Sequence, residues 1–131
     1  MEQLRKNKEF IINYLNALSG VAKSRALIEQ YVADEGLIGH IVFFEAAFPK
    51  YEMFADELTA EDNRVTVRAR IRGTHLGDLG GIAPTYKTFE LPFAIGYEIV
   101  NNKIVSHWIA ADQMSLMEQL GVMPAREATH L

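Results

Sequence analysis

The stretch Phe89–Ile99, FELPFAIGYEI, carries the clearest structural signal in this chain. Large apolar and aromatic residues occupy every second position, and smaller or charged residues lie between them. Successive side chains of a β-strand point to opposite sides, so this period of two predicts a strand with one almost entirely apolar face. Tyr97 places a single phenol near the end of that face.

The residues after this stretch predict a turn and a second strand. Asn101 and Asn102 follow the apolar strand, and asparagine favours tight turns because it tolerates positive φ. A two-residue loop would place Ile95 opposite Trp108. A three-residue loop with a bulge would instead place Ile95 opposite His107. The local pattern leaves both registers open.

A further strand is expected over Arg64–Arg72, where apolar residues alternate strictly with arginines. The arginine row could bind an anion. Cross-strand ion pairing is the simpler interpretation, because acidic residues lie on the neighbouring expected strands and turns. These acidic residues are Glu52, Asp56, Glu57, Glu61 and Glu90.

Helical periodicity precedes the strands. Apolar residues recur at helical spacing over residues 2–18, a second helix fits 23–33, and a third fits 37–48 before Pro49. His40 lies on the apolar face of the third helix. Three helices, antiparallel strands and a short C-terminal helix predict an α+β domain in which the helices cover one face of a curved sheet.

Composition narrows the classes of function. The chain has 131 residues, 49% of them hydrophobic, which suits a single domain over residues 1–131. It contains no cysteine, which excludes disulfides and thiolate nucleophiles. A net charge of -4 with interspersed signs argues against nucleic acid as a partner. No signal peptide or membrane-spanning run is visible, so we expect a cytoplasmic protein without a membrane partner.

The C-terminal segment Ile104–Gly121, IVSHWIAADQMSLMEQLG, resembles the SnoaL-like polyketide cyclases. In that family the last strand reads roughly GKI, two residues, His, Trp or Arg, Asp, with another Asp three residues later and a closing helix that ends in QLG. The matching residues are Lys103, Ile104, His107, Trp108, Asp112, Gln119, Leu120 and Gly121. Two glycine segments, 73–77 and 80–85, resemble the family's connection between its central strands. The resemblance spans residues 40 to 121 and implies a cone-shaped, nuclear transport factor 2-like fold and a homodimer.

Two positions depart from the family pattern. Ile109 stands where the cyclases have their proton-transferring Asp, and Ile95 stands where they have an inward His. Abstraction of a proton from a carbon next to a carbonyl needs a positioned base, and isoleucine offers none. We favour the register that puts Ile95, His107 and Ile109 on one face, because the corresponding family positions line one pocket.

The resemblance and the alternation together give a candidate site. Its expected lining is an apolar cone, and its polar side chains are His40, Tyr97 and His107. The apolar members are Phe44, Phe93, Ile95 and Ile109. Such a lining suits a small hydrophobic molecule held by a few oriented hydrogen bonds. Each histidine could also be a neutral core residue bonded to a backbone carbonyl.

These residues are compatible with three functions. The first is an enzyme of cyclase or isomerase type whose base has moved to His107 or His40, with Tyr97 as donor to a developing oxyanion. The second is a non-catalytic binder of an apolar small molecule, and the third is a dimerisation module without a ligand. We expect no cofactor and no metal, because His40, His75 and His107 lack the spacing of a local metal motif.

We expect structural and not catalytic roles for Asp112 and Trp108. Asp112 directly precedes the expected closing helix, where an Asp would cap the first free backbone N–H groups. Trp108 would point away from the pocket in the preferred register. We expect it to form a dimer contact together with Ala94 and Ala110.

Overall fold

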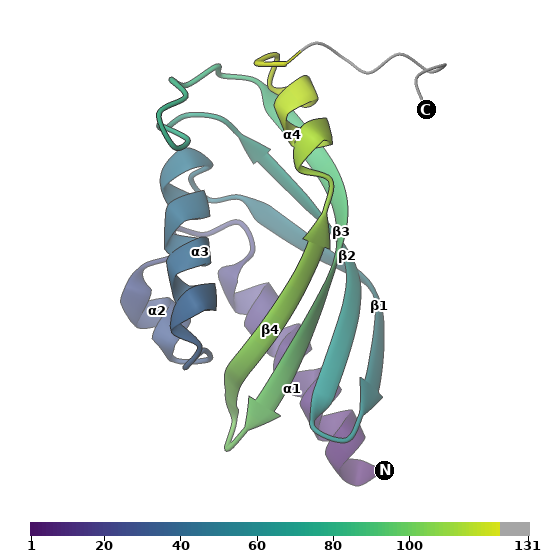
Figure 1. The fold of residues 1–131 in the computed structure, drawn as a ribbon. Helices are drawn as coiled ribbons and strands as arrows, with labels where there is room; N and C mark the ends of the chain where they lie inside the picture. Colours follow the sequence, from purple (N-terminus) through teal and green to yellow (C-terminus); the bar gives the residue numbers. More distant parts are fainter. Residues whose placement is uncertain (124–131) are drawn as a thin grey trace, which may run out of the picture.

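The computed structural model describes residues 1–123, and it shows helices packed on a single antiparallel sheet (Figure 1). The elements are α1 (Glu2–Leu18), α2 (Arg25–Glu29), α3 (Glu35–Ala47), β1 (Glu52–Glu61), β2 (Arg64–Thr74), β3 (Thr88–Val100), β4 (Lys103–Ala111) and α4 (Gln113–Gln119). The predicted α+β class is confirmed. No helix in this described part is long and apolar enough to cross a membrane.

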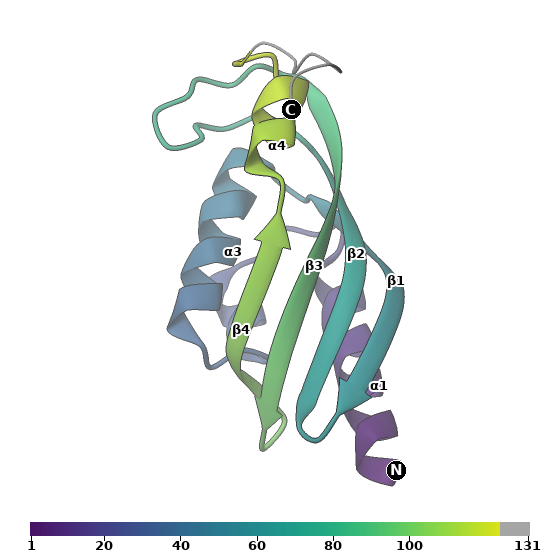
Figure 2. The same cartoon turned by 45° about the vertical axis from the view of Figure 1, so that its right-hand side comes forward.

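The strands follow one another across the sheet in the order β1-β2-β3-β4, and the sheet is strongly twisted. Figure 2 shows α1 behind the sheet and α3 beside β4, so the helices lie on its concave side. The short α4 closes one end of the sheet above the tip of β4. The pocket described below lies between α3 and this curved surface.

The alternation of β2 separates a core face from a solvent face. Val65, Val67, Ala69 and Ile71 are buried, and the arginines between them point outward. Arg70 bonds Asp56 on β1 at 3.0 Å, and Arg72 bonds Glu52 at 2.9 Å. The ion-pair interpretation of the arginine row is therefore confirmed. Such exposed pairs contribute at most about 1 kcal/mol each.

The second helix is shorter than the 23–33 that the periodicity predicts. It is capped by Ser24, whose hydroxyl accepts a hydrogen bond from the Leu27 N–H at 3.2 Å, and it ends at Glu29. The following backbone bonds to β4: Val32 forms a bridge with Ile104, and the Ala33 N–H donates to the Ile104 carbonyl at 2.8 Å. The prediction for this segment was wrong at its C-terminal end, because a distant strand takes up these backbone groups.

The hairpin between β3 and β4 combines a tight turn with a bulge. Asn101 and Asn102 have φ of 52° and 59°, as a two-residue hairpin loop requires. The register then shifts by one residue, because Ile99 pairs with Ile104 while Glu98 pairs with Ser106. Both expected registers were wrong.

The bulge places Ile95 opposite Ile109 and Tyr97 opposite His107. Directly opposed residues share a face. The expected grouping of Ile95, His107 and Ile109 on one face is thus confirmed. Trp108 lies over Gly96 on the other face and is 47% exposed.

Candidate functional site

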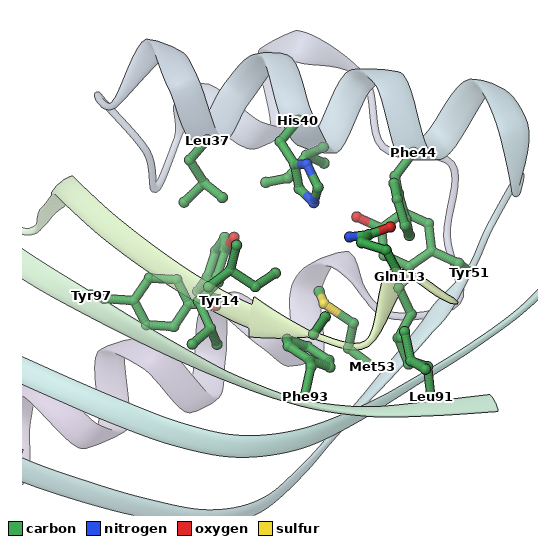
Figure 3. A pocket seen from close by; sticks show the side chains of 15 residues that line it. Tyr14, Leu37, His40, Phe44, Tyr51, Met53, Leu91, Phe93, Tyr97 and Gln113 are labelled. Carbon is green, nitrogen blue, oxygen red and sulfur yellow. The ribbon is translucent and has the colours of Figure 1, made fainter. Parts of the chain in front are cut away.

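An apolar pocket lies between α3 and the concave face of the sheet (Figure 3). The cavity volume is about 50 Å³, which leaves room for a few water molecules, since one water needs roughly 10–15 Å³ on the same measure. The lining residues are Tyr14, Leu37, His40, Ile41, Phe44, Tyr51, Met53, Ile71, Leu91, Phe93, Ile95, Tyr97, Ile109, Ala111 and Gln113. Six of the seven residues predicted for the site are in this lining, and His107 is not.

His40 is the one imidazole in the lining. The i, i+4 spacing on α3 stacks its ring on Phe44 at 5.0 Å between centroids. Figure 3 shows the ring extending from α3 into the pocket. Burial, and to a smaller extent the nearby His107, lower the pKa of His40 below the usual 6.5. The side chain is therefore neutral at pH 7, and no other described residue hydrogen-bonds its ring nitrogens.

Three tyrosines supply the buried hydroxyl groups of the pocket. Tyr97 on β3 was predicted, whereas Tyr14 on α1 and Tyr51 before β1 were missed. The rings of Tyr14 and Tyr97 meet edge to face at 5.7 Å. Burial raises the pKa of all three phenols, so each remains protonated and able to donate. Sequence spacing could show only that Tyr14 lies on the buried side of its helix.

His107 forms a pair with Asp34 outside the pocket lining. Its Nδ1 lies 2.6 Å from Asp34 Oδ2, and both side chains are largely buried. Asp34 also caps α3, because its Oδ1 accepts hydrogen bonds from the backbone N–H groups of Gly36 at 2.9 Å and Leu37 at 3.3 Å. The pair fixes the start of α3 to β4.

The pKa of Asp34 reflects these contacts. Burial alone would raise it, but the hydrogen bond from His107 and those from the backbone together lower it below the ordinary value. Asp34 was missed in the sequence. Its position just before the third helix was a capping signal, yet its partner lies 73 residues away.

Two isoleucines, Ile95 and Ile109, sit side by side in the lining. Ile95 and Ile109 are paired across β3 and β4; Ile95 is buried, and Ile109 is 42% exposed. Ile109 therefore belongs to the pocket opening. Gln113, which was not predicted, brings a carboxamide to the same region, and Figure 3 shows it facing Tyr51 and Phe44.

The remaining polar residues of the sequence motifs are structural. His75 directly follows β2 and is fully buried. Its Nδ1 accepts a hydrogen bond from the Thr85 N–H at 3.2 Å, which joins the two glycine segments. Asp112 caps α4 through the Ser115 N–H at 3.0 Å, as predicted. Within residues 1–123, no three His, Asp or Glu side chains gather closely enough to hold a metal ion.

Residues 17–120 match the family model described as SnoaL-like polyketide cyclase. No protein with a curated description matches the sequence. Among solved structures, AclR from Streptomyces galilaeus superposes with a TM-score of 0.80 at 20% identity, covering 95% of this chain and 87% of that one.

Two other similar structures carry cyclase names. A SnoaL-like polyketide cyclase-type protein from Jannaschia sp. CCS1 gives a TM-score of 0.78 at 17% identity, over 92% of this chain and 94% of its own. IdmH from Streptomyces antibioticus gives 0.71 at 21% identity, over 88% and 98%. These structures share the fold.

Proposed function

Because the chain belongs to the SnoaL-like polyketide cyclase family, we propose that it binds a small hydrophobic carbonyl compound and catalyses proton transfer on it, in a cyclisation or isomerisation. The observation that carries this proposal is His40. It is a neutral imidazole with a lowered pKa, it has no hydrogen-bond partner among the described residues, and it enters an otherwise apolar pocket. Apolar walls with a few directed polar groups are typical of small-molecule sites.

The chemistry is a proton transfer at the carbon next to the carbonyl. The free electron pair of the His40 imidazole takes the proton, the C–H electrons form a C=C bond, and the carbonyl π electrons move to oxygen. A phenol O–H in the pocket stabilises that oxygen as charge develops. The imidazolium then returns its proton to the enolate. A positioned base contributes about 10²- to 10⁴-fold in rate.

The two histidines differ in their position relative to the pocket. His107 shares its Nδ1 with Asp34 and lies outside the lining, whereas His40 lies inside it. We therefore assign the base to His40. His107 contributes indirectly, because its nearby imidazole adds to the effect of burial in lowering the pKa of His40.

Non-catalytic binding is the second candidate function. Ile95 and Ile109 favour it, since the pair gives the lining apolar contact where the cyclases have acid–base groups. Apolar contact stabilises ground and transition states alike, so it supports affinity without supporting rate.

Hydrogen–deuterium exchange at the central carbon of benzoylacetone, a 1,3-diketone, separates the two functions. We expect the wild type to exceed the background exchange and His40→Phe, which keeps an aromatic ring beside Phe44, to lose about 100-fold. His75→Asn is the matched control, because His75 lies outside the pocket. If the wild type binds benzoylacetone without accelerating its exchange, non-catalytic binding is the function. Equal exchange in wild type and His40→Phe would refute the assignment of the base.

A further inference from the structure

A second cavity lies at the end of the sheet away from α4, where the β1–β2 and β3–β4 turns approach the start of α1 (Figure 1). Its volume is about 360 Å³, within the roughly 300–1,000 Å³ of small-molecule sites. It shares no lining residue with the pocket between α3 and the sheet. The residues that line this amide-lined cavity are Gln3, Asn7, Asn63, Ile99, Asn101 and Asn102.

Carboxamides dominate the amide-lined cavity. The chain contains ten Asn and Gln residues, and five of them lie in this lining. They come from three separate segments, which are α1, the turn between β1 and β2, and the turn between β3 and β4. The remaining residue, Ile99, is apolar and buried. No lining side chain carries a charge, so the cavity suits an uncharged ligand that is rich in hydrogen-bonding groups.

Hydrogen bonds within the wall fix the orientation of the inner carboxamides. Asn7 is 5% exposed; its Oδ1 accepts from Gln3 Nε2 at 2.9 Å, and its Nδ2 donates to the Asp62 carbonyl at 3.4 Å. Asn63 Nδ2 donates to Glu98 Oε2 at 3.2 Å. A carboxamide has two N–H donors and an oxygen that accepts two bonds. Within residues 1–123, the oxygens of Gln3 and Asn63 and one N–H of Asn7 therefore stay available to a ligand.

The β3–β4 turn keeps side chains where the backbone favours glycine. Asn101 and Asn102 have φ of 52° and 59°, a left-handed conformation that glycine adopts at lower cost. Hairpin turns of this kind prefer Gly at the second position. Both carboxamides are exposed at the cavity and have no hydrogen-bond partner among the described residues. The backbone alone does not require a carboxamide at position 102, whereas contact with a ligand gives it a use.

We propose that the amide-lined cavity binds an uncharged, ring-shaped polyol such as a hexose. Each hydroxyl of a vicinal diol both donates and accepts, and so does each carboxamide, so neighbouring hydroxyls can pair with the two ends of one amide. Ile99 offers apolar contact to the C–H groups of the ring. Glu98 bonds Asn63 and places negative charge beside the wall, which disfavours an anionic ligand. Because the two sites share no lining residue, binding here does not depend on chemistry at His40.

Titration of the ¹⁵N-labelled protein with methyl β-D-glucopyranoside tests this proposal through the NMR signals of the side-chain amides. We expect shifts in the NH₂ signals of the five lining carboxamides and a dissociation constant of about 1 mM, as is usual for a small polar ligand. Tetrahydropyran, which has the same ring without hydroxyls, should leave these signals in place. Methyl β-D-glucuronide, which adds a carboxylate, should bind more weakly than the glucoside.

Two substitutions remove single carboxamides from the lining. Asn102→Gly keeps the turn, because glycine adopts a positive φ readily, and loss of the hydrogen bond should weaken glucoside binding about fivefold. Gln3→Ala should give a similar loss. Asn13→Ala is the matched control, because Asn13 is an exposed carboxamide on α1 outside the cavity, and its affinity should equal that of the wild type. Circular dichroism shows whether each variant is folded.

The proposal would be overturned by an absence of shifts at the lining carboxamides, or by shifts of equal size at Asn13 and Gln30. Equal effects of the glucoside and tetrahydropyran, or wild-type affinity in both Asn102→Gly and Gln3→Ala, would also overturn it. Failure of His40 to catalyse exchange would leave it standing, because the amide signals report only the amide-lined cavity.

Discussion

At the scale of single residues, Ile95 and Ile109 stand at the two positions where the resemblance to the family leads us to expect acid–base residues. Their pairing across β3 and β4 places two side chains of the same lining side by side. An acid–base pair at these two positions would therefore be adjacent in the pocket. Opposed positions of this kind have Cβ atoms about 4.5–5.5 Å apart.

Restoring that pair should raise catalysis more than binding. In Ile95→His with Ile109→Asp, we expect exchange on benzoylacetone to rise by about 10²-fold or more, while its Kd changes little, because a base acts chiefly on the transition state. Ile109 is 42% exposed, so its Asp keeps contact with water. The rates are compared after circular dichroism shows both proteins folded. Equal exchange in wild type and double variant would contradict the role given to the two isoleucines.

The stability of the protein should depend on His40 in mildly acidic solution. The pKa of His40 is lowered in the folded state, so below its ordinary value of 6.5 the unfolded chain takes up the proton first. Stability is thereby lost as pH falls from 6.5 toward the folded pKa. Urea unfolding of wild type and His40→Gln over this range should show a smaller loss in the variant. Parallel curves would show that His40 is not buried in its neutral form.

At the scale of elements, the Asp34–His107 pair joins the start of α3 to β4, and α3 carries His40 into the pocket. Asp34 has two functions here, as helix cap and as hydrogen-bond partner of His107. Asp112 performs the first function alone at α4. The position of the proposed base thus depends on a contact between two elements far apart in the sequence.

Asp34→Ala should therefore cost more stability than Asp112→Ala. Loss of a cap costs about 0.5–2 kcal/mol, and an unmatched buried partner adds about 1–3 kcal/mol. We expect about 1 kcal/mol for Asp112→Ala and about 2–4 kcal/mol for Asp34→Ala in urea unfolding. A double-mutant cycle with His107→Ala measures the pair itself. A coupling energy near zero would mean that Asp34 acts only as a cap.

At the scale of the whole molecule, one face of the sheet packs against helices and the other carries the outward row of Ala94, Trp108 and Ala110. Trp108 lies across Gly96, where a Cβ would stand 2.1 Å from the indole Nε1. The indole therefore spreads over this face and leaves 47% of its surface exposed. A large aromatic surface of this kind is typical of a contact site.

We propose that this face forms a homodimer. Light scattering at micromolar concentration should give twice the monomer mass of 14.8 kDa for the wild type, and Trp108→Glu should give the monomer. Tyr86→Glu is the control, because Tyr86 is 72% exposed and lies outside the outward row. A monomer mass for the wild type would refute the dimer.

Local patterns in the sequence determined the fold class, the two strand faces and the cap of α4. The alternation in β2 and β3 depends only on the period of a strand, and Asp112 and Pro49 act on their immediate neighbours. They also placed Phe93, Ile95 and Tyr97 in the pocket lining, because every second residue of β3 faces the same side.

The tertiary structure alone decided the hairpin register, the end of α2, the partner of His107 and the place of Tyr14 in the pocket. Each depends on groups that are distant in sequence. The Ile104 N–H donates to Tyr31 and its carbonyl accepts from Ala33 and Asp34, so this segment and β4 fix one another beside the bulge. The Asp34–His107 and Tyr14–Tyr97 pairs likewise join residues that only the folded chain brings into contact. Local periodicity carries no information about such contacts, because they are set by how whole elements pack.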